Sequence, residues 1–104
     1  MDSILPDIML ILGKYTPDKG VKLEQEAGSR TLDKAKKISS LCLAQLRRSP
    51  KGAVLADGYE QDPQTYVRPV ELELRAAFDS DPAFAASLKG LLAQYEHALE
   101  EHRH

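Results

Sequence analysis

Apolar residues recur along much of the chain at intervals of three and four, the spacing that places side chains on one face of an α-helix. One stripe follows Asp81-Pro82 and comprises Phe84, Leu88, Leu91, Tyr95 and Ala98. Another follows Asp62-Pro63 and comprises Tyr66, Val67, Val70, Leu74, Ala77 and Phe78. A third follows Thr31 and comprises Leu32, Ala35, Ile38, Cys42 and Leu46. These stripes predict three amphipathic helices, the last of which runs to roughly residue 101.

A small residue followed by proline occurs four times, as Thr16-Pro17, Ser49-Pro50, Asp62-Pro63 and Asp81-Pro82. The side-chain oxygen of Ser, Thr or Asp accepts a hydrogen bond from the first turn of a helix. Proline at the first helical position loses nothing, because its missing N–H would have no partner there. The four pairs therefore predict four helix starts. Thr31 is a candidate cap for the helix that ends near Leu46, and Pro69 is expected to kink its helix or delay its start.

Three further segments have weaker helical patterns. Residues 4–13 are apolar nearly all round and are bounded by Pro6 and Gly13, which favours a short buried helix. Residues 17–27 close with a glycine, and residues 50–60 contain two glycines that each cost about 1 kcal/mol in a helix interior. No alternating strand pattern bounded by a hairpin turn occurs. We therefore expect an all-α chain folded as a compact orthogonal bundle of five to six short helices.

Composition restricts the classes of protein further. With 104 residues, of which 42% are hydrophobic and 29% charged, the chain is expected to form a single globular domain over residues 1–104. A net charge of −2 predicts neither an obligate nucleic-acid protein nor a membrane-surface protein. Asp2 and Asp7 have the wrong sign for a signal peptide, and the apolar run near them is far shorter than the ~20 residues of a membrane span. Together with the single cysteine, this predicts a cytoplasmic protein.

Residues that could carry chemistry are few. His97 and Glu101 are four apart and could form two metal ligands, but no third or fourth ligand accompanies them, so no metal is expected. Cys42 has leucine on both sides and is expected to pack in the core. No nucleophile, base and oxyanion constellation and no phosphate loop can be named. We therefore expect neither an enzyme nor a cofactor.

Charge is distributed unevenly along the chain. Residues 1–52 contain ten Lys or Arg and six acids, a net charge of +4, and the remainder contains four Lys or Arg and ten acids, a net charge of −6. A domain with one positive and one negative face is suited to head-to-tail association with a protein partner, including a second copy. The candidate contact residues on the basic side are Arg47, Arg48 and Lys51, and those on the acidic side are Glu71, Glu73, Asp79 and Asp81.

Three leucines fall outside the main apolar stripes of their helices, namely Leu43, Leu72 and Leu92. Either the bundle buries them, or they form an apolar patch for a partner. The pattern of the sequence leaves both outcomes open.

The order of motifs in the second half resembles a known class of small helical domain. The matching segments are Gly58-Tyr59-Glu60-Gln61-Asp62-Pro63, Val67-Arg68-Pro69-Val70, and residues 81–92. They cover about half the chain and are similar to the effector-associated, or bacterial death-like, domains found beside bacterial defence effectors. The resemblance implies a death-fold-like six-helix bundle. It also implies a non-catalytic adaptor that joins a protease, a nucleotidase or a nucleotide-binding switch through like-with-like contacts.

Two other functions remain open. The basic segment 30–51 could place Arg30, Lys34, Lys37 and Arg48 on one outer helix face, as in a small DNA-binding or toxin-neutralising regulator. The acidic second half would repel a duplex, so a nucleic-acid partner is less favoured than a protein partner. The chain could also be a helical domain of an enzyme that contributes no active-site residue.

Overall fold

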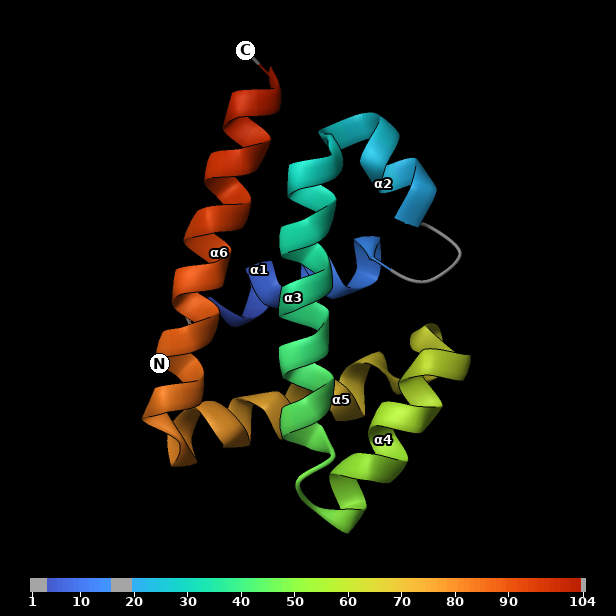
Figure 1. The fold of residues 1–104 in the computed structure, drawn as a ribbon. Coiled ribbons are helices and arrows are strands. Elements are labelled where there is room, and N and C mark those ends of the chain that lie inside the picture. The colour runs from blue at the N-terminus through green and yellow to red at the C-terminus, as the bar shows by residue number, and fades with distance from the viewer. Residues whose placement is uncertain (1–3, 16–19, 104) are drawn as a thin grey trace.

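Six α-helices make up the computed structural model, which describes residues 4–15 and 20–103 (Figure 1). In chain order these are α1 (Leu5–Lys14), α2 (Gly20–Ala27), α3 (Ser29–Leu46), α4 (Pro50–Gln61), α5 (Pro63–Ser80) and α6 (Pro82–Arg103). No strand occurs among these residues. The all-α prediction is confirmed, and the three segments with weaker patterns are helical as far as they are described.

The helices cross rather than run parallel. α3 and α6 stand side by side and pack on one another, while α1 and α5 run across them from behind (Figure 1). α4 lies at one end of α3 and packs on α5, and α2 lies at the other end of α3. The radius of gyration is 13.3 Å, close to the roughly 13 Å expected of a folded domain of this length. This arrangement agrees with the expected compact orthogonal bundle of five to six helices.

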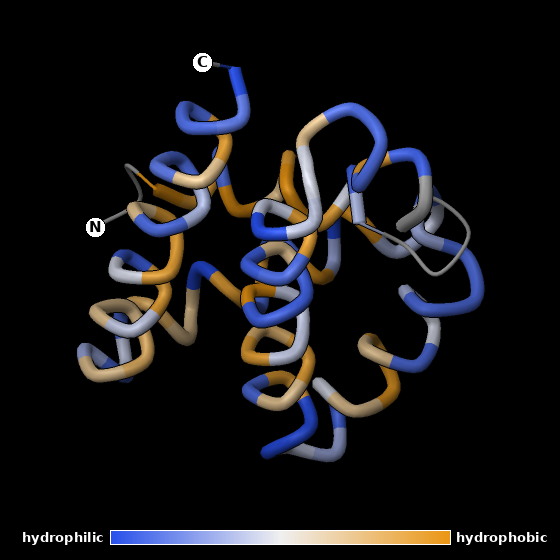
Figure 2. The backbone as a smooth tube through the Cα atoms, turned by 45° about the horizontal axis from the view of Figure 1, so that its top comes forward, coloured by the Kyte–Doolittle hydropathy of each residue, from blue (hydrophilic) through white to orange (hydrophobic). Residues whose placement is uncertain are grey.

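One hydrophobic core receives side chains from all six helices. The five apolar positions predicted for α3 are all buried, and the hydrophobic positions of α6 turn toward α3 (Figure 2). Of the three leucines outside the main stripes, Leu92 is buried and Leu43 is half-buried against the core. Leu72 remains 54% exposed on α5. Burial against the bundle therefore accounts for two of the three.

Three of the four proline pairs begin helices as predicted. Ser49 accepts a hydrogen bond from the N–H of Gly52 at 3.0 Å, and Asp62 accepts one from the N–H of Thr65 at 3.4 Å. Asp81 accepts one from the N–H of Phe84 at 3.1 Å. The proline that follows each cap is the first residue of α4, α5 or α6. Thr16-Pro17 lies outside the described residues.

The prediction that Thr31 caps a helix is wrong. α3 begins two residues earlier, at Ser29, because Gly28 with a φ of 92° turns the chain directly out of α2. Thr31 is consequently inside the first turn of α3, fully buried, and its Oγ1 has no hydrogen-bond partner among the described residues. Pro69 does not delay the start of its helix, since α5 runs from Pro63 through it to Ser80.

The two glycines of α4 allow close packing. A methyl group at Gly52 would overlap the backbone carbonyl of Leu46, which belongs to the preceding helix. A methyl group at Gly58 would overlap the ring of Tyr66 on α5. These contacts explain why α4 tolerates the helix-propensity cost of both glycines, and they place α4 tightly against the end of α3 and against α5.

Candidate functional site

The three basic residues predicted to contact a partner lie around the turn between α3 and α4. Arg47 directly follows α3, and its Nη2 lies 3.0 Å from Oδ1 of Asp57 and 2.9 Å from Oε1 of Glu60, both on α4. The hydrogen bonds from Glu60 and Asp57 raise the pKa of the Arg47 guanidinium. Arg47 therefore bridges two carboxylates that are three residues apart on one side of α4.

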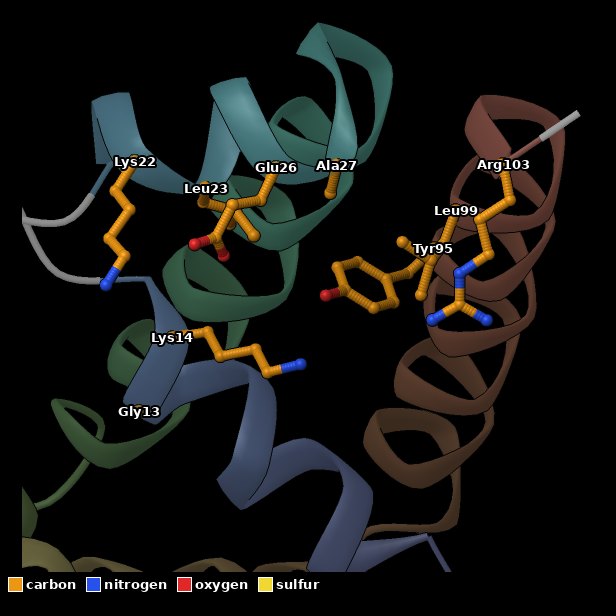
Figure 3. A pocket seen from close by; sticks show the side chains of 9 residues that line it. All are labelled: Gly13, Lys14, Lys22, Leu23, Glu26, Ala27, Tyr95, Leu99 and Arg103. Carbon is orange, nitrogen blue, oxygen red and sulfur yellow. The ribbon is translucent and has the colours of Figure 1, made fainter.

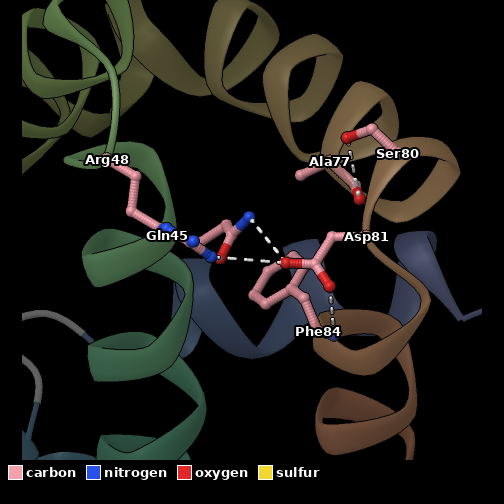
Figure 4. Close-up of polar contacts among 6 residues, drawn as sticks. All are labelled: Gln45, Arg48, Ala77, Ser80, Asp81 and Phe84. Atoms are coloured by element: carbon pink, nitrogen blue, oxygen red, sulfur yellow. Dashed lines mark hydrogen bonds and ion pairs between the residues drawn. The ribbon is translucent and has the colours of Figure 1, made fainter.

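Arg48 contacts the beginning of α6. Its Nη1 lies 3.4 Å from Oδ2 of Asp81, and the amide of Gln45 donates to the same oxygen at 3.4 Å (Figure 4). The other oxygen of Asp81 accepts the hydrogen bond from Phe84 that caps α6. One carboxylate thus caps α6 and links it to the last turns of α3. Gln45, which no sequence pattern singled out, completes this contact.

The predicted acidic residues are spread along α5 and its C-terminal end. Oε1 of Glu73 lies 3.0 Å from Nζ of Lys51 on α4, and Glu71 pairs with Arg68 on its own helix at 3.6 Å. Asp79 is exposed near the end of α5. The structure therefore brings Glu73 to α4 and leaves Glu71 in a contact within α5.

The expected separation into a basic side and an acidic side is wrong for these residues. Arg48 contacts Asp81 and Lys51 contacts Glu73, so members of the two predicted groups are neighbours. At the far end of α3, Arg30 pairs with Glu101 of α6 at 2.7 Å. Four cations of the positive first half pair with carboxylates of the negative second half, namely Arg30, Arg47, Arg48 and Lys51. The packing of α3 against α6 and of α4 against α5 brings the two halves together.

Exposure differs between the two members of these pairs. The side chains of Arg48 and Lys51 are 70% and 77% exposed, whereas those of Asp81 and Glu73 are 28% and 26% exposed. In these two pairs the cation therefore lies outside and the carboxylate beneath it. Around Arg47 the order is reversed, because Asp57 and Glu60 are more exposed than the guanidinium that they contact.

An exposed apolar residue lies among these charges. Lys51, Val54 and Asp57 are spaced three apart and so follow one side of α4, and Asp57 contacts Arg47. We call these four residues, Arg47, Lys51, Val54 and Asp57, the α4 surface. Val54 is 64% exposed, the most exposed of the large hydrophobic residues that are described. The others, Leu10, Val67 and Leu72, lie on α1 and α5.

Two residues that could carry chemistry, Cys42 and His97, lie outside the α4 surface. Cys42 is 1% exposed in the core, as predicted, and burial raises the pKa of its thiol to about 12. His97 lies 2.6 Å from Glu101, the contact that their spacing predicted, but the described residues contain no group of three or more ligands that could hold a metal ion. None of the described helices has the length and hydropathy needed to cross a membrane.

The chain matches no protein-family model, no curated protein and no solved structure. The resemblance to effector-associated domains therefore stays a prediction from the motifs at residues 58–63, 67–70 and 81–92.

Proposed function

We propose that this chain is a non-catalytic protein-interaction module that associates with other helical domains, as in a bacterial defence or signalling assembly. The observation that carries the proposal is the α4 surface, where Val54 is 64% exposed between charged neighbours on an otherwise tightly packed helix. A buried apolar centre with a charged rim is the usual anatomy of a protein interface. The resemblance to effector-associated domains supports the same class of function.

The ion pairs at this surface can exchange partners at small cost. Exposed pairs contribute only about 0–1 kcal/mol each, because water screens the charges and the long side chains lose entropy. Arg47 has five N–H donors, and Lys51 has three. Each can add a carboxylate from a partner while keeping its present contact with Asp57 or Glu73. The α4 surface would thus select an acidic partner surface.

A second copy of the chain is the partner we propose, bound head to tail. The complementary surface is the outer face of α5, where Leu72 is 54% exposed and Asp79 follows two turns later on the same stripe. Val54 of one copy would contact Leu72 of the next, and the cations of the α3–α4 turn would lie beside Asp79. Because the two surfaces differ, each copy has one of each to offer, and association continues into chains.

Size-exclusion chromatography with light scattering tests this directly. Between about 10 μM and 1 mM protein, the mean mass should rise with concentration. It should fall when salt is raised from about 0.05 M to 0.5 M, because the charged rim is screened. Val54→Asp and Leu72→Asp should each be monomeric alone. A mixture of the two should form dimers and nothing longer, since each variant retains one intact surface.

Lys89→Glu is the matched control, because Lys89 is exposed on α6 and belongs to neither surface. It should associate like the parent chain. A monomer at every concentration, or a mixture of the two variants that stays monomeric, would contradict head-to-tail association.

The nucleic-acid alternative has less support from the charge pattern. Within segment 30–51, Arg30, Lys37 and Arg48 each pair with a carboxylate, as do Arg47 and Lys51. Pairing lowers the charge available for phosphate contacts. A gel shift with a random duplex at about 0.15 M salt separates the two functions, because tight, salt-sensitive binding would favour the regulator.

A further inference from the structure

A pocket of about 380 Å³ opens where the C-terminal ends of α1 and α6 meet α2 (Figure 3). Its volume is within the range of about 300–1,000 Å³ that small-molecule sites occupy. The apolar part of the wall consists of Leu23, Ala27, Leu99 and the ring of Tyr95. The charged part consists of Lys14, Lys22, Glu26 and Arg103.

The charged residues of the pocket are unbalanced. Among the described residues that line the pocket, three cations, Lys14, Lys22 and Arg103, accompany one carboxylate, Glu26, which gives these residues a net charge of +2. The hydroxyl of Tyr95 points toward the side of the pocket where the ammonium of Lys14 lies, whereas the guanidinium of Arg103 lies on the α6 side and Lys22 lies at the opposite rim (Figure 3). The three cations come from three different helices, so the fold and not local sequence brings them together.

Within the part of the chain that the structure describes, these cations lack the carboxylate partners that six other cations of the bundle have. Arg30, Lys37, Arg47, Arg48, Lys51 and Arg68 are all paired with carboxylates. Among the described residues, Lys14, Lys22 and Arg103 form no such ion pair. Lys22 is also in the first turn of α2, where a positive charge opposes the helix dipole. The stability of α2 therefore does not explain why a lysine occupies position 22.

Tyr95 adds a hydrogen-bond donor to this positive site. Its side chain is only 5% exposed, and its hydroxyl reaches the pocket from α6. Burial raises the pKa of the Tyr95 hydroxyl, while the charge of Arg103 acts to lower it. The hydroxyl consequently stays protonated near neutral pH, where it can donate to an anion.

We infer that this pocket binds a phosphate monoester that carries a small ring or a short alkyl group. A phosphate monoester bears a charge of roughly −1.5 to −2 at neutral pH, which matches the excess of +2 in the pocket. Lys14 and the hydroxyl of Tyr95 would contact the phosphate, while Arg103 and Lys22, at opposite rims of the pocket, add to its positive potential. Leu23, Leu99 and the Tyr95 ring would contact the apolar part of the ligand.

This site is independent of the proposed function. It lies at the α2 end of α3, whereas the α4 surface lies at the opposite end of the bundle (Figure 1). Failure of ligand binding would therefore leave head-to-tail association untouched, and the reverse also holds.

NMR titration with phenyl phosphate tests the assignment, with the Tyr95 ring and the methyl groups of Leu23 and Leu99 as reporters. We expect saturable shifts with a Kd on the order of 1 mM or below. Inorganic phosphate lacks the apolar part and benzyl alcohol lacks the charge, so each should bind about tenfold or more weakly. If phenyl phosphate caused no saturable shift at Tyr95, the assignment would be overturned. The same holds if benzoate, which carries a single charge, bound as tightly as phenyl phosphate.

Substitutions at exposed positions separate charge recognition from folding. Lys14→Gln, Lys22→Gln and Arg103→Gln should each weaken phenyl phosphate about three- to tenfold. Glu26→Gln should strengthen binding about two- to fivefold, because it removes the only carboxylate of the pocket. Lys89→Gln, which lies outside the pocket, should leave the Kd unchanged. The proposal would be overturned if Glu26→Gln bound phenyl phosphate more weakly than the parent chain does, or if all three cation variants bound it as tightly as the parent chain.

Discussion

The carboxylate of Asp81 joins the start of α6 to the end of α3, because its Oδ2 lies 3.4 Å from Nη1 of Arg48 while its Oδ1 caps the N–H of Phe84. The two functions of this side chain differ in their expected energies. The cap satisfies a half-buried backbone N–H, whereas the contact with Arg48 is an exposed pair. The main function of Asp81 is therefore to cap α6. A partner molecule would meet the exposed guanidinium of Arg48, which Asp81 helps to hold in place.

Substitution of Asp81 should separate the cap from the ion pair. We expect Asp81→Ala to lower the free energy of unfolding by about 1–2 kcal/mol, the usual cost of a lost N-cap. Asp81→Asn keeps the cap and should cost less, and Arg48→Ala should cost about 0–1 kcal/mol. Urea denaturation measures all three. A loss in Arg48→Ala as large as that in Asp81→Ala would show that the pair, and not the cap, dominates.

Two glycines that are both inside helices should respond oppositely to alanine. Gly52→Ala should destabilise the protein by about 2 kcal/mol or more, since the new methyl group overlaps the backbone carbonyl of Leu46. Gly90→Ala should stabilise it by about 0.5–1 kcal/mol, because nothing lies within 4 Å and alanine is the better helix former. Thermal and urea unfolding of the two variants would measure the contrast. Equal effects would mean that the α3–α4 turn is looser than described.

Removal of the buried hydroxyl of Thr31 should stabilise the bundle. Oγ1 of Thr31 is fully buried and has no partner among the described residues, so it carries a desolvation cost with no compensating hydrogen bond. Thr31→Val keeps the shape and should raise the free energy of unfolding by about 1 kcal/mol. Thr31→Ser keeps the hydroxyl and loses the methyl group, and it should therefore destabilise. A destabilised Thr31→Val would indicate that the hydroxyl has a partner in solution.

Stability should fall at alkaline pH because of Cys42. Burial raises the pKa of its thiol to about 12 in the folded state, whereas an unfolded cysteine ionises near 8.5. Above that value the unfolded chain releases a proton that the folded chain retains, so this contribution to stability is complete below about pH 8.5 and is lost as the pH rises toward about 12. The buried Tyr59 and Tyr95 have raised pKa values and act in the same direction at higher pH.

The measurement is the free energy of unfolding between pH 8 and about 10, compared between the parent chain and Cys42→Ala. Cys42 accounts for at most about 1.4 kcal/mol per pH unit of the slope, and the variant should lack that part. Slow labelling of Cys42 by a thiol reagent in the native state provides an independent check. Parallel slopes in the two proteins would contradict the burial of the thiol.

Helix starts were predictable wherever their cause is local. Asp62-Pro63 and Asp81-Pro82 each combine a cap and a first helical residue, and both are seen in the structure. Thr31 has the chemistry of a cap, but the start of α3 is decided by Gly28, whose positive φ turns the chain three residues earlier. The prediction of Thr31 as a cap was wrong because Gly28, at the junction of two helices, takes the N-cap position of α3 instead. No local pattern in the sequence shows which of these two residues takes that position.

The candidate contact residues were predicted only as exposed charges near helix ends. Their separation into two sides was wrong because Arg48 and Asp81 are 33 residues apart in sequence and meet through the packing of α3 against α6. Asp57 and Glu60, which hold Arg47, were not singled out, although their spacing on α4 is a signal that two carboxylates share one side. Which cation pairs with these two carboxylates depends on the conformation of the turn before α4.

Amino-acid order was sufficient for the helices, their apolar faces and the burial of Cys42, because each depends on residues within a few turns of one another. The pairing of Lys51 with Glu73 and the gathering of Lys14, Lys22 and Arg103 around one pocket depend on how separate helices cross. Crossing angles come from the fit of many side chains across the core, a collective property that no local pattern encodes. The arrangement of charged side chains on the surface of this protein therefore depends on how its helices pack.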